Sequence, residues 1–168
     1  MAAPERKEAF GRWRRSTTVL LPLSVTLLAL VLYSGTLAPT VLWGDDAELQ
    51  RIIVTGEQRT IGQSSSASHL LWLALTSWFV RVSDMPRDVA GRVNFVSALF
   101  AALTVLFTYL TAAEIARRQA KGLLSSMGPL AGIAAAAALA LSHTFWLLAV
   151  RPNVYTLQTA LVSTALWL

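Results

Sequence analysis

The sequence predicts an all-α integral membrane protein, because of its composition, its long apolar runs and the placement of its charges. Hydrophobic residues make up 55% of the 168 residues and charged residues only 14%, whereas soluble domains carry about 25% charged residues. Mean hydropathy is +0.55. The net charge of +5 does not indicate nucleic-acid binding, because the basic residues are spread over several segments instead of gathering on one face.

The first predicted span is the apolar run 17–37, which follows a basic tail at residues 1–16. A helix needs about 20 mostly apolar residues to cross a bilayer, and this run is too long for the apolar part of a cleaved signal peptide. We therefore expect a retained anchor. The tail holds five Lys and Arg residues, so the positive-inside rule places it in the cytoplasm.

Further spans are predicted at 93–113 and 128–150, and an incomplete one at 154–168. The segment 69–80 is apolar and rich in aromatic residues. Its twelve residues would rise only about 18 Å as a helix, which predicts a helix at the membrane interface instead. The run from residue 154 is still apolar at residue 168. We therefore expect the N-terminal part of a longer polytopic protein, or a truncated gene.

Charge decides the predicted topology. If 69–80 does not cross the membrane, the segment with Arg117, Arg118 and Lys121 is cytoplasmic, as the positive-inside rule prefers. Residues 38–92 then form one long extracytoplasmic loop with short helices at about 46–55 and 69–80. The expected location is the cell membrane, as a multi-pass protein with a cytoplasmic N-terminus. This topology brings residues 45–48 and 151–153 to the same face.

An acidic cluster lies just after the first predicted span. Asp45, Asp46 and Glu48 are three carboxylates within four positions. Charged groups are costly inside a bilayer, so acids at a membrane exit tend to serve ions, headgroups or chemistry. One interpretation is structural: Asp45 caps the helix, Glu48 completes a capping box, and Gly56 ends the helix. In the other, a carboxylate at this helix start also acts as a base.

Three stretches of the chain resemble a known family. They are TLAPTVLWGDDAEL at 36–49, DVAGRVNFVSALF at 88–100, and the segment 142–157 with its SHTFW and AVRPNVYTL motifs. Their order and spacing are similar to those of bacterial membrane proteins related to protein O-mannosyltransferases, in the GT-C superfamily of lipid-phosphate-sugar glycosyltransferases. The resemblance implies a GT-C-like transmembrane helix bundle with juxtamembrane helices in the first outer loop, which carries an essential acid.

The resemblance also implies roles for individual residues. Asp45 matches the first-loop aspartate, the expected catalytic base. Glu48 keeps an acid of the motif, and Asp46 stands where the family often has serine. Asp46 would also raise the pKa of Asp45 by repulsion, which suits a base.

Four residues are the expected substrate-binding positions: Arg92, Arg151, Asn153 and Tyr155. Either arginine would hold the lipid phosphate, since guanidinium suits bidentate phosphate contact. The alternative for each arginine is an interfacial anchor. Asn153 stands where the family has a second acid, and this departure weakens any metal-site proposal. No cysteine is present and the two histidines are far apart in sequence, so no metal site is predicted; a divalent cofactor is left without support.

The predicted function is sugar transfer from a polyprenyl-phosphate donor to a hydroxyl of an acceptor protein or glycan on the extracytoplasmic face. The 168 residues alone are expected to be inactive. The alternative is a non-catalytic polytopic membrane module or a degenerate transferase fragment. A transporter is disfavoured, because the predicted spans 17–37, 93–113 and 128–150 contain no Asp, Glu, Lys or Arg.

Overall fold

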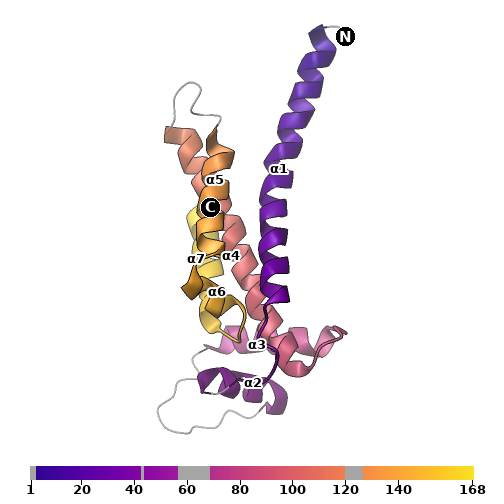
Figure 1. Ribbon diagram of the computed structural model, residues 1–168, viewed down its shortest axis with the longest axis vertical. Coiled ribbons are helices and arrows are strands. Elements are labelled where there is room, and N and C mark those ends of the chain that lie inside the picture. The colour runs from indigo at the N-terminus through magenta and orange to yellow at the C-terminus, as the bar shows by residue number, and fades with distance from the viewer. Residues whose placement is uncertain (1–2, 43, 57–68, 120–126) are drawn as a thin grey trace.

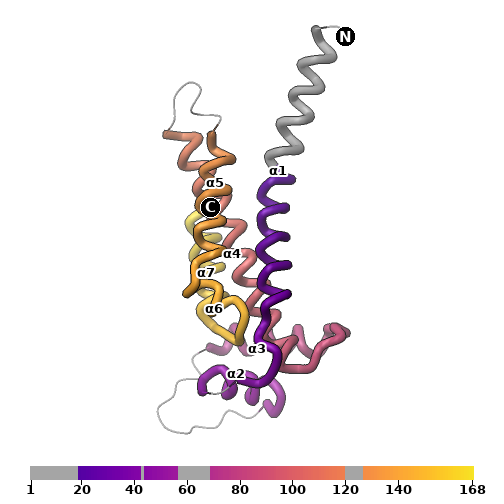
Figure 2. The backbone as a smooth tube through the Cα atoms, viewed as in Figure 1, coloured from indigo at the N-terminus to yellow at the C-terminus, as the bar shows by residue number. Residues whose placement is uncertain are grey.

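The computed structural model describes residues 3–42, 44–56, 69–119 and 127–168, with side chains from residue 19 onward. Within these ranges every regular element is a helix (Figures 1 and 2). The helices are α1 (Ala3–Gly35), α2 (Asp45–Thr55), α3 (Leu70–Val82), α4 (Val89–Gln119), α5 (Gly128–Ala140), α6 (His143–Ala149) and α7 (Val154–Trp167). The all-α prediction is confirmed for this part of the chain.

Helix α4 is the centre of the bundle, and every other helix packs against it. It begins after Asp88, whose carboxylate accepts a hydrogen bond from the Gly91 amide at 2.7 Å, as an N-cap does. The helix therefore starts four residues before the predicted span 93–113 and continues to Gln119. Among the described residues it is the one single helix long and apolar enough to cross a membrane.

Helix α1 covers residues 17–35 of the predicted span 17–37, ends two residues before the span does, and extends well beyond it toward the N-terminus (Figure 1). The chain is helical from residue 3, so the predicted boundary between tail and span is not a helix end. Its described apolar part, Val19–Gly35, is too short to count as a span by itself. The side chains of the basic tail lie outside the described residues.

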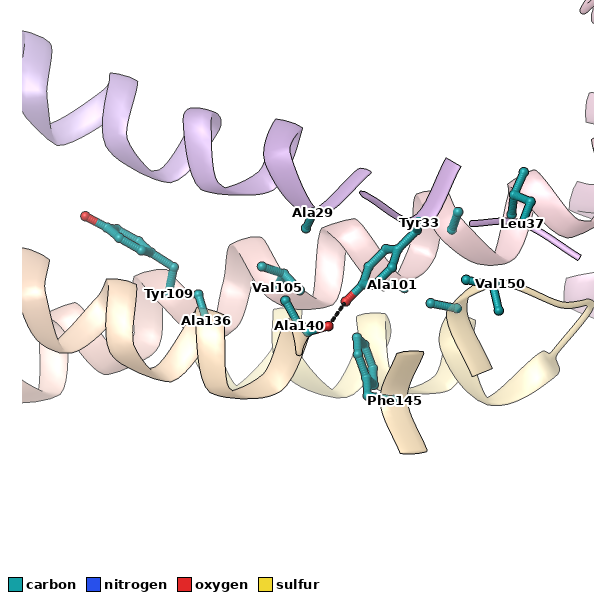
Figure 3. Packing of buried hydrophobic residues seen from close by; sticks show 12 residues of the cluster. Ala29, Tyr33, Leu37, Ala101, Val105, Tyr109, Ala136, Ala140, Phe145 and Val150 are labelled. Atoms are coloured by element: carbon teal, nitrogen blue, oxygen red, sulfur yellow. Dashed lines mark hydrogen bonds between the residues drawn. The ribbon is translucent and has the colours of Figure 1, made fainter. Parts of the chain in front are cut away.

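The predicted span 128–150 is not one continuous helix, because this stretch forms two helices. Helices α5 and α6 meet at a bend of 70°, and Ser142 between them has an extended backbone. The break frees the Ala140 carbonyl, which accepts a hydrogen bond from the Tyr33 hydroxyl at 3.1 Å (Figure 3). Trp146 of α6 donates to the Thr36 hydroxyl at 3.1 Å. Residues at the end of α1 thus provide partners for the interrupted helix.

Helices α4 and α5 approach each other through small residues. A methyl group added at Gly132 would lie 2.9 Å from the Tyr109 carbonyl oxygen, and one at Gly128 would lie 2.8 Å from that of Ala113. Ala136 and Ala140 continue the contact into an apolar core shared by α1, α4, α5 and α6 (Figure 3). The Gly-x-x-x-Gly spacing therefore serves helix packing within this chain.

Two short helices lie at the end of the bundle opposite the N-terminus of α1 (Figure 1). Leu49, Ile52 and Ile53 of α2 pack with Trp72 and Leu73 of α3 in a second apolar cluster. Helix α3 has 13 residues and no more. The prediction of two short helices between the first and second long ones is confirmed, and the Ser-rich segment 63–68 lies outside the described residues.

One face of α3 is left exposed. Leu70, Leu71, Trp78 and Val82 are each more than half exposed, while Trp72 is buried. Apolar side chains on the outer face of a short helix suit the interfacial position expected from the sequence.

Candidate functional site

The acidic cluster forms the first turn of helix α2, but none of its side chains caps the helix. The helix begins at Asp45, not at residue 46, and its N-cap is Gly44 with a φ of 71° and no side-chain cap bond. This left-handed backbone conformation favours glycine. The prediction that Asp45 is the N-cap is therefore wrong. Gly56, with a φ of 71°, does end the helix as predicted, and its amide donates to the Ile52 carbonyl.

Glu48 takes no part in a capping box. Both of its carboxylate oxygens accept hydrogen bonds from Arg51, at 2.7 and 2.8 Å. This is an i,i+3 pair on the surface of α2. The Glu48 backbone amide instead donates to the Gly44 carbonyl at 3.2 Å. The three acids nevertheless occupy the first turn, where the positive end of the helix dipole favours negative charge.

Asp46 connects the acidic cluster to the α6–α7 turn. Its Oδ2 accepts from Arg151 Nη1 at 3.4 Å across 105 positions of sequence. Arg151 also donates from Nε to the Leu147 carbonyl at 3.0 Å, which fixes the direction of its side chain. The topology argument predicted that residues 45–48 and 151–153 share one face, and the ion pair confirms that they meet.

The pKa of Asp46 is raised above its ordinary value. Burial is the main cause, the Arg151 guanidinium acts in the opposite direction, and the charge of Asp45 adds to the increase. The repulsion expected between the two aspartates thus contributes to the raised pKa of Asp46. Asp45 itself is exposed beside the pair.

Asn153 and Tyr155 lie at the start of α7, next to Arg151. The Asn153 side chain accepts a hydrogen bond from the Tyr155 amide at 2.9 Å and caps the helix. Tyr155 is 55% exposed. The sequence carried a signal for this cap, because an asparagine directly precedes the apolar run of α7.

Arg92 has a different environment from Arg151. Its Nη1 donates to the Val80 carbonyl at 3.2 Å and to the Ser83 carbonyl at 3.0 Å. These carbonyls end helix α3, so Arg92 satisfies groups that the helix leaves unpaired. The structure therefore brings Arg151, but not Arg92, to the acidic cluster by a direct contact.

Within the described residues, no group of three or more His, Asp or Glu side chains is arranged to hold a metal ion. His69 precedes α3 and His143 begins α6.

Three buried polar residues near the site were not predicted from the sequence. Gln50, Asn94 and Ser97 are almost completely buried. A polar residue within an apolar helical run, such as Asn94 in the first turns of α4, is the signal that could have revealed them.

The described chain is thus a helical bundle with a long apolar helix and an acid–guanidinium pair at one end. The family described as the N-terminal domain of protein O-mannosyl-transferase TMEM260 matches residues 66–168. The match covers more than half of the chain, which therefore belongs to this O-mannosyltransferase-related family. It includes Arg92, Arg151, Asn153 and Tyr155 but not the acidic cluster. No curated protein and no solved structure matches the chain.

Proposed function

We propose that the chain forms the N-terminal part of a multi-pass GT-C-like membrane glycosyltransferase. This enzyme transfers a sugar, mannose by the family name, from a polyprenyl-phosphate donor to a hydroxyl of an acceptor protein or glycan. The site faces the extracytoplasmic side of the cell membrane. The family, the apolar helix α4 and the short helices α2 and α3 beside it support this proposal.

The proposed orientation follows from charge. Arg117 and Arg118 lie at the end of α4 away from the site, and both pair with Glu114. If α4 crosses the bilayer, these basic residues belong on the cytoplasmic side. Helix α2 and the α6–α7 turn then lie on the outer side.

The observation that carries the proposal is the contact between Asp46 and Arg151. Sugar transfer needs a base for the acceptor proton and a cation for the leaving phosphate. The acidic turn and Arg151 place both kinds of group at one end of the bundle. The pair is partly exposed, with 39% of the Arg151 side chain and 16% of the Asp46 side chain accessible. Donors of the guanidinium are therefore accessible to a phosphate.

In the proposed reaction, Asp45 takes the proton from the acceptor hydroxyl. The hydroxyl oxygen forms a bond to the anomeric carbon, and the bond from that carbon to the phosphate oxygen breaks. The polyprenyl phosphate leaves with the negative charge, which Arg151 stabilises. Asp45 is assigned the base because it is exposed, whereas Asp46 is partly buried and pairs with Arg151.

A non-catalytic membrane module is the second candidate. Asn153 favours it, because this amide occupies the expected position of a second acid and is used as the N-cap of α7. A cap is a structural role that needs no chemistry.

Replacing Asp45 by asparagine separates the two candidates. In the full-length protein in native membranes, Asp45→Asn should lower mannose transfer from a polyprenyl-phosphate donor by about 10²–10⁴-fold, the usual contribution of a general base. Asp84→Asn is the matched control, because Asp84 is an exposed aspartate of the same predicted loop and should leave transfer unchanged. Unchanged transfer in Asp45→Asn would show that Asp45 is not the base, whereas a parent protein that transfers no mannose would favour the non-catalytic module.

A further inference from the structure

Two buried polar side chains of α4 hold the segments that carry the candidate site. Asn94 and Ser97 are three positions apart, so they lie on one face of the helix. Both have no exposed surface. Neither has a part in the proposed chemistry, although both belong to the motif at 88–100.

Asn94 binds the acidic side of the site. Its Oδ1 accepts from Gln50 Nε2 of α2 at 2.9 Å, and its Nδ2 donates to the Ala38 carbonyl at 3.0 Å. The Gln50 Oε1 in turn accepts from the Leu42 amide at 3.1 Å. Asn94 therefore fixes α2, one turn from Asp46, together with the chain that leaves α1.

Ser97 binds the arginine side of the site. Its hydroxyl oxygen accepts a hydrogen bond from the backbone N–H of Asn153 at 2.9 Å and lies 3.4 Å from the backbone carbonyl oxygen of Asn153. The Ala38 amide donates to the Val150 carbonyl at 2.9 Å. Arg151 is therefore held between two backbone contacts, one made by Ser97 and one made by the segment that Asn94 fixes.

The ion pair itself is too weak to bring these segments together. Arg151 and Asp46 are 3.4 Å apart and partly exposed, and solvent screens such pairs strongly. Buried hydrogen bonds within a satisfied network hold a more definite geometry, because breaking one leaves a buried polar group without a partner. We propose that Asn94 and Ser97 are positioning residues that set the separation of Asp46 and Arg151. Their importance for sugar transfer rests on the proposed function.

Cysteine crosslinking tests this positioning without a transfer assay. The 168 residues contain no cysteine, so the double variant Asp46→Cys, Arg151→Cys carries the only thiols in this part of the protein. It also removes the ion pair, which leaves the scaffold alone to hold the two positions together. A short bifunctional thiol reagent should crosslink this pair in the full-length protein in native membranes.

A second cysteine pair reports on the packing of α4 against α7. The Thr104 and Thr159 hydroxyl oxygens are 3.2 Å apart. Thr104 lies two helical turns, or about 10 Å, from Ser97 along α4. The double variant Thr104→Cys, Thr159→Cys should therefore crosslink for as long as the two helices remain packed.

Ser97→Ala or Asn94→Leu should lower crosslinking of the 46/151 pair several-fold and leave the 104/159 pair unchanged. Thr104→Val, the matched control, removes a side-chain contact between the same two helices and should leave the 46/151 yield unchanged. The proposal is overturned if the 46/151 yield stays at the parent value in both variants, or if both pairs fall together, as general loosening would cause. Transfer activity can be absent without affecting this result, so failure of the proposed function remains distinguishable.

Discussion

The contact between α4 and α5 and the contact between α4 and the candidate site are built from opposite kinds of residues. At the first, Gly128 and Gly132 let two backbones approach, and the surrounding side chains are apolar. At the second, Asn94 and Ser97 bind backbone and amide groups of other segments. Both contacts belong to the same long helix.

The difference shows how one helix uses close packing to associate with a neighbouring helix and hydrogen bonds to fix the positions of other segments. Lipid tails are as apolar as leucine, so helices in a bilayer associate through close packing and not through burial of apolar surface. Such packing keeps helices together at many small shifts in register. Directional hydrogen bonds between buried groups permit far fewer arrangements. The site is therefore expected at the polar end, where the positions of the segments are fixed.

The largest expected loss of stability comes from adding a methyl group at the close contact between α4 and α5. Gly132→Ala places a methyl group 2.9 Å from the Tyr109 carbonyl oxygen and 3.0 Å from the Tyr109 ring. Backbone must then move, and overpacking of this kind costs about 1–3 kcal/mol. Thermal unfolding of the detergent-solubilised protein should show a lower midpoint.

The control for this change is Gly35→Ala, at the end of α1. A methyl group there meets no atom within 4 Å, so the same chemical change should leave the unfolding midpoint unchanged or slightly higher. Equal effects at both glycines would mean that helix propensity, not the close approach, determines the outcome.

Removing a single hydrogen bond from the apolar core should lower the stability by a smaller amount. Tyr33→Phe removes the hydroxyl that donates to the Ala140 carbonyl where α5 stops. The buried carbonyl then lacks its partner, at a cost of about 1–2 kcal/mol in the free energy of unfolding. Tyr155→Phe, on a half-exposed ring, should change stability by less than about 0.5 kcal/mol. A Tyr33→Phe variant as stable as the parent would show that the bend needs no side-chain support.

The sequence predicted most of the helices, because apolar runs and their lengths are local properties. The 128–150 stretch is the exception. Its break is accompanied by distant contacts, because Tyr33 donates to the Ala140 carbonyl and Thr36 accepts from the Trp146 indole, each more than a hundred residues away in sequence. The hydropathy of the segment itself contains no information about such distant contacts. The capping role of Asp45 failed for a related reason, because Gly44 adopts a backbone conformation that a consensus cap pattern does not consider.

The candidate site was predicted in part. The topology argument, from length and charge, placed residues 45–48 and 151–153 on one face, and in the structure Arg151 contacts Asp46. Which of Arg92 and Arg151 would hold the lipid phosphate was left open. Only the fold shows that Arg92 is used at the end of α3. The partners of Gln50 and Asn94 come from different helices and follow from no local pattern.

The smallest expected effect is a pH dependence at the polar end. Burial raises the pKa of Asp46 in the folded protein, more than Arg151 lowers it. The folded chain therefore takes up this proton at a higher pH than the unfolded chain does. The stability contributed by protonation is fully present below the ordinary aspartate pKa, and it is lost as the pH rises through the raised value. Asp46→Asn should flatten this part of the curve of unfolding free energy against pH, while Asp84→Asn should not. If the unfolding free energy of Asp46→Asn keeps the parent's slope against pH, Arg151 and solvent compensate the partly buried charge of Asp46. The stability of this end of the bundle then depends on its neutral hydrogen bonds alone.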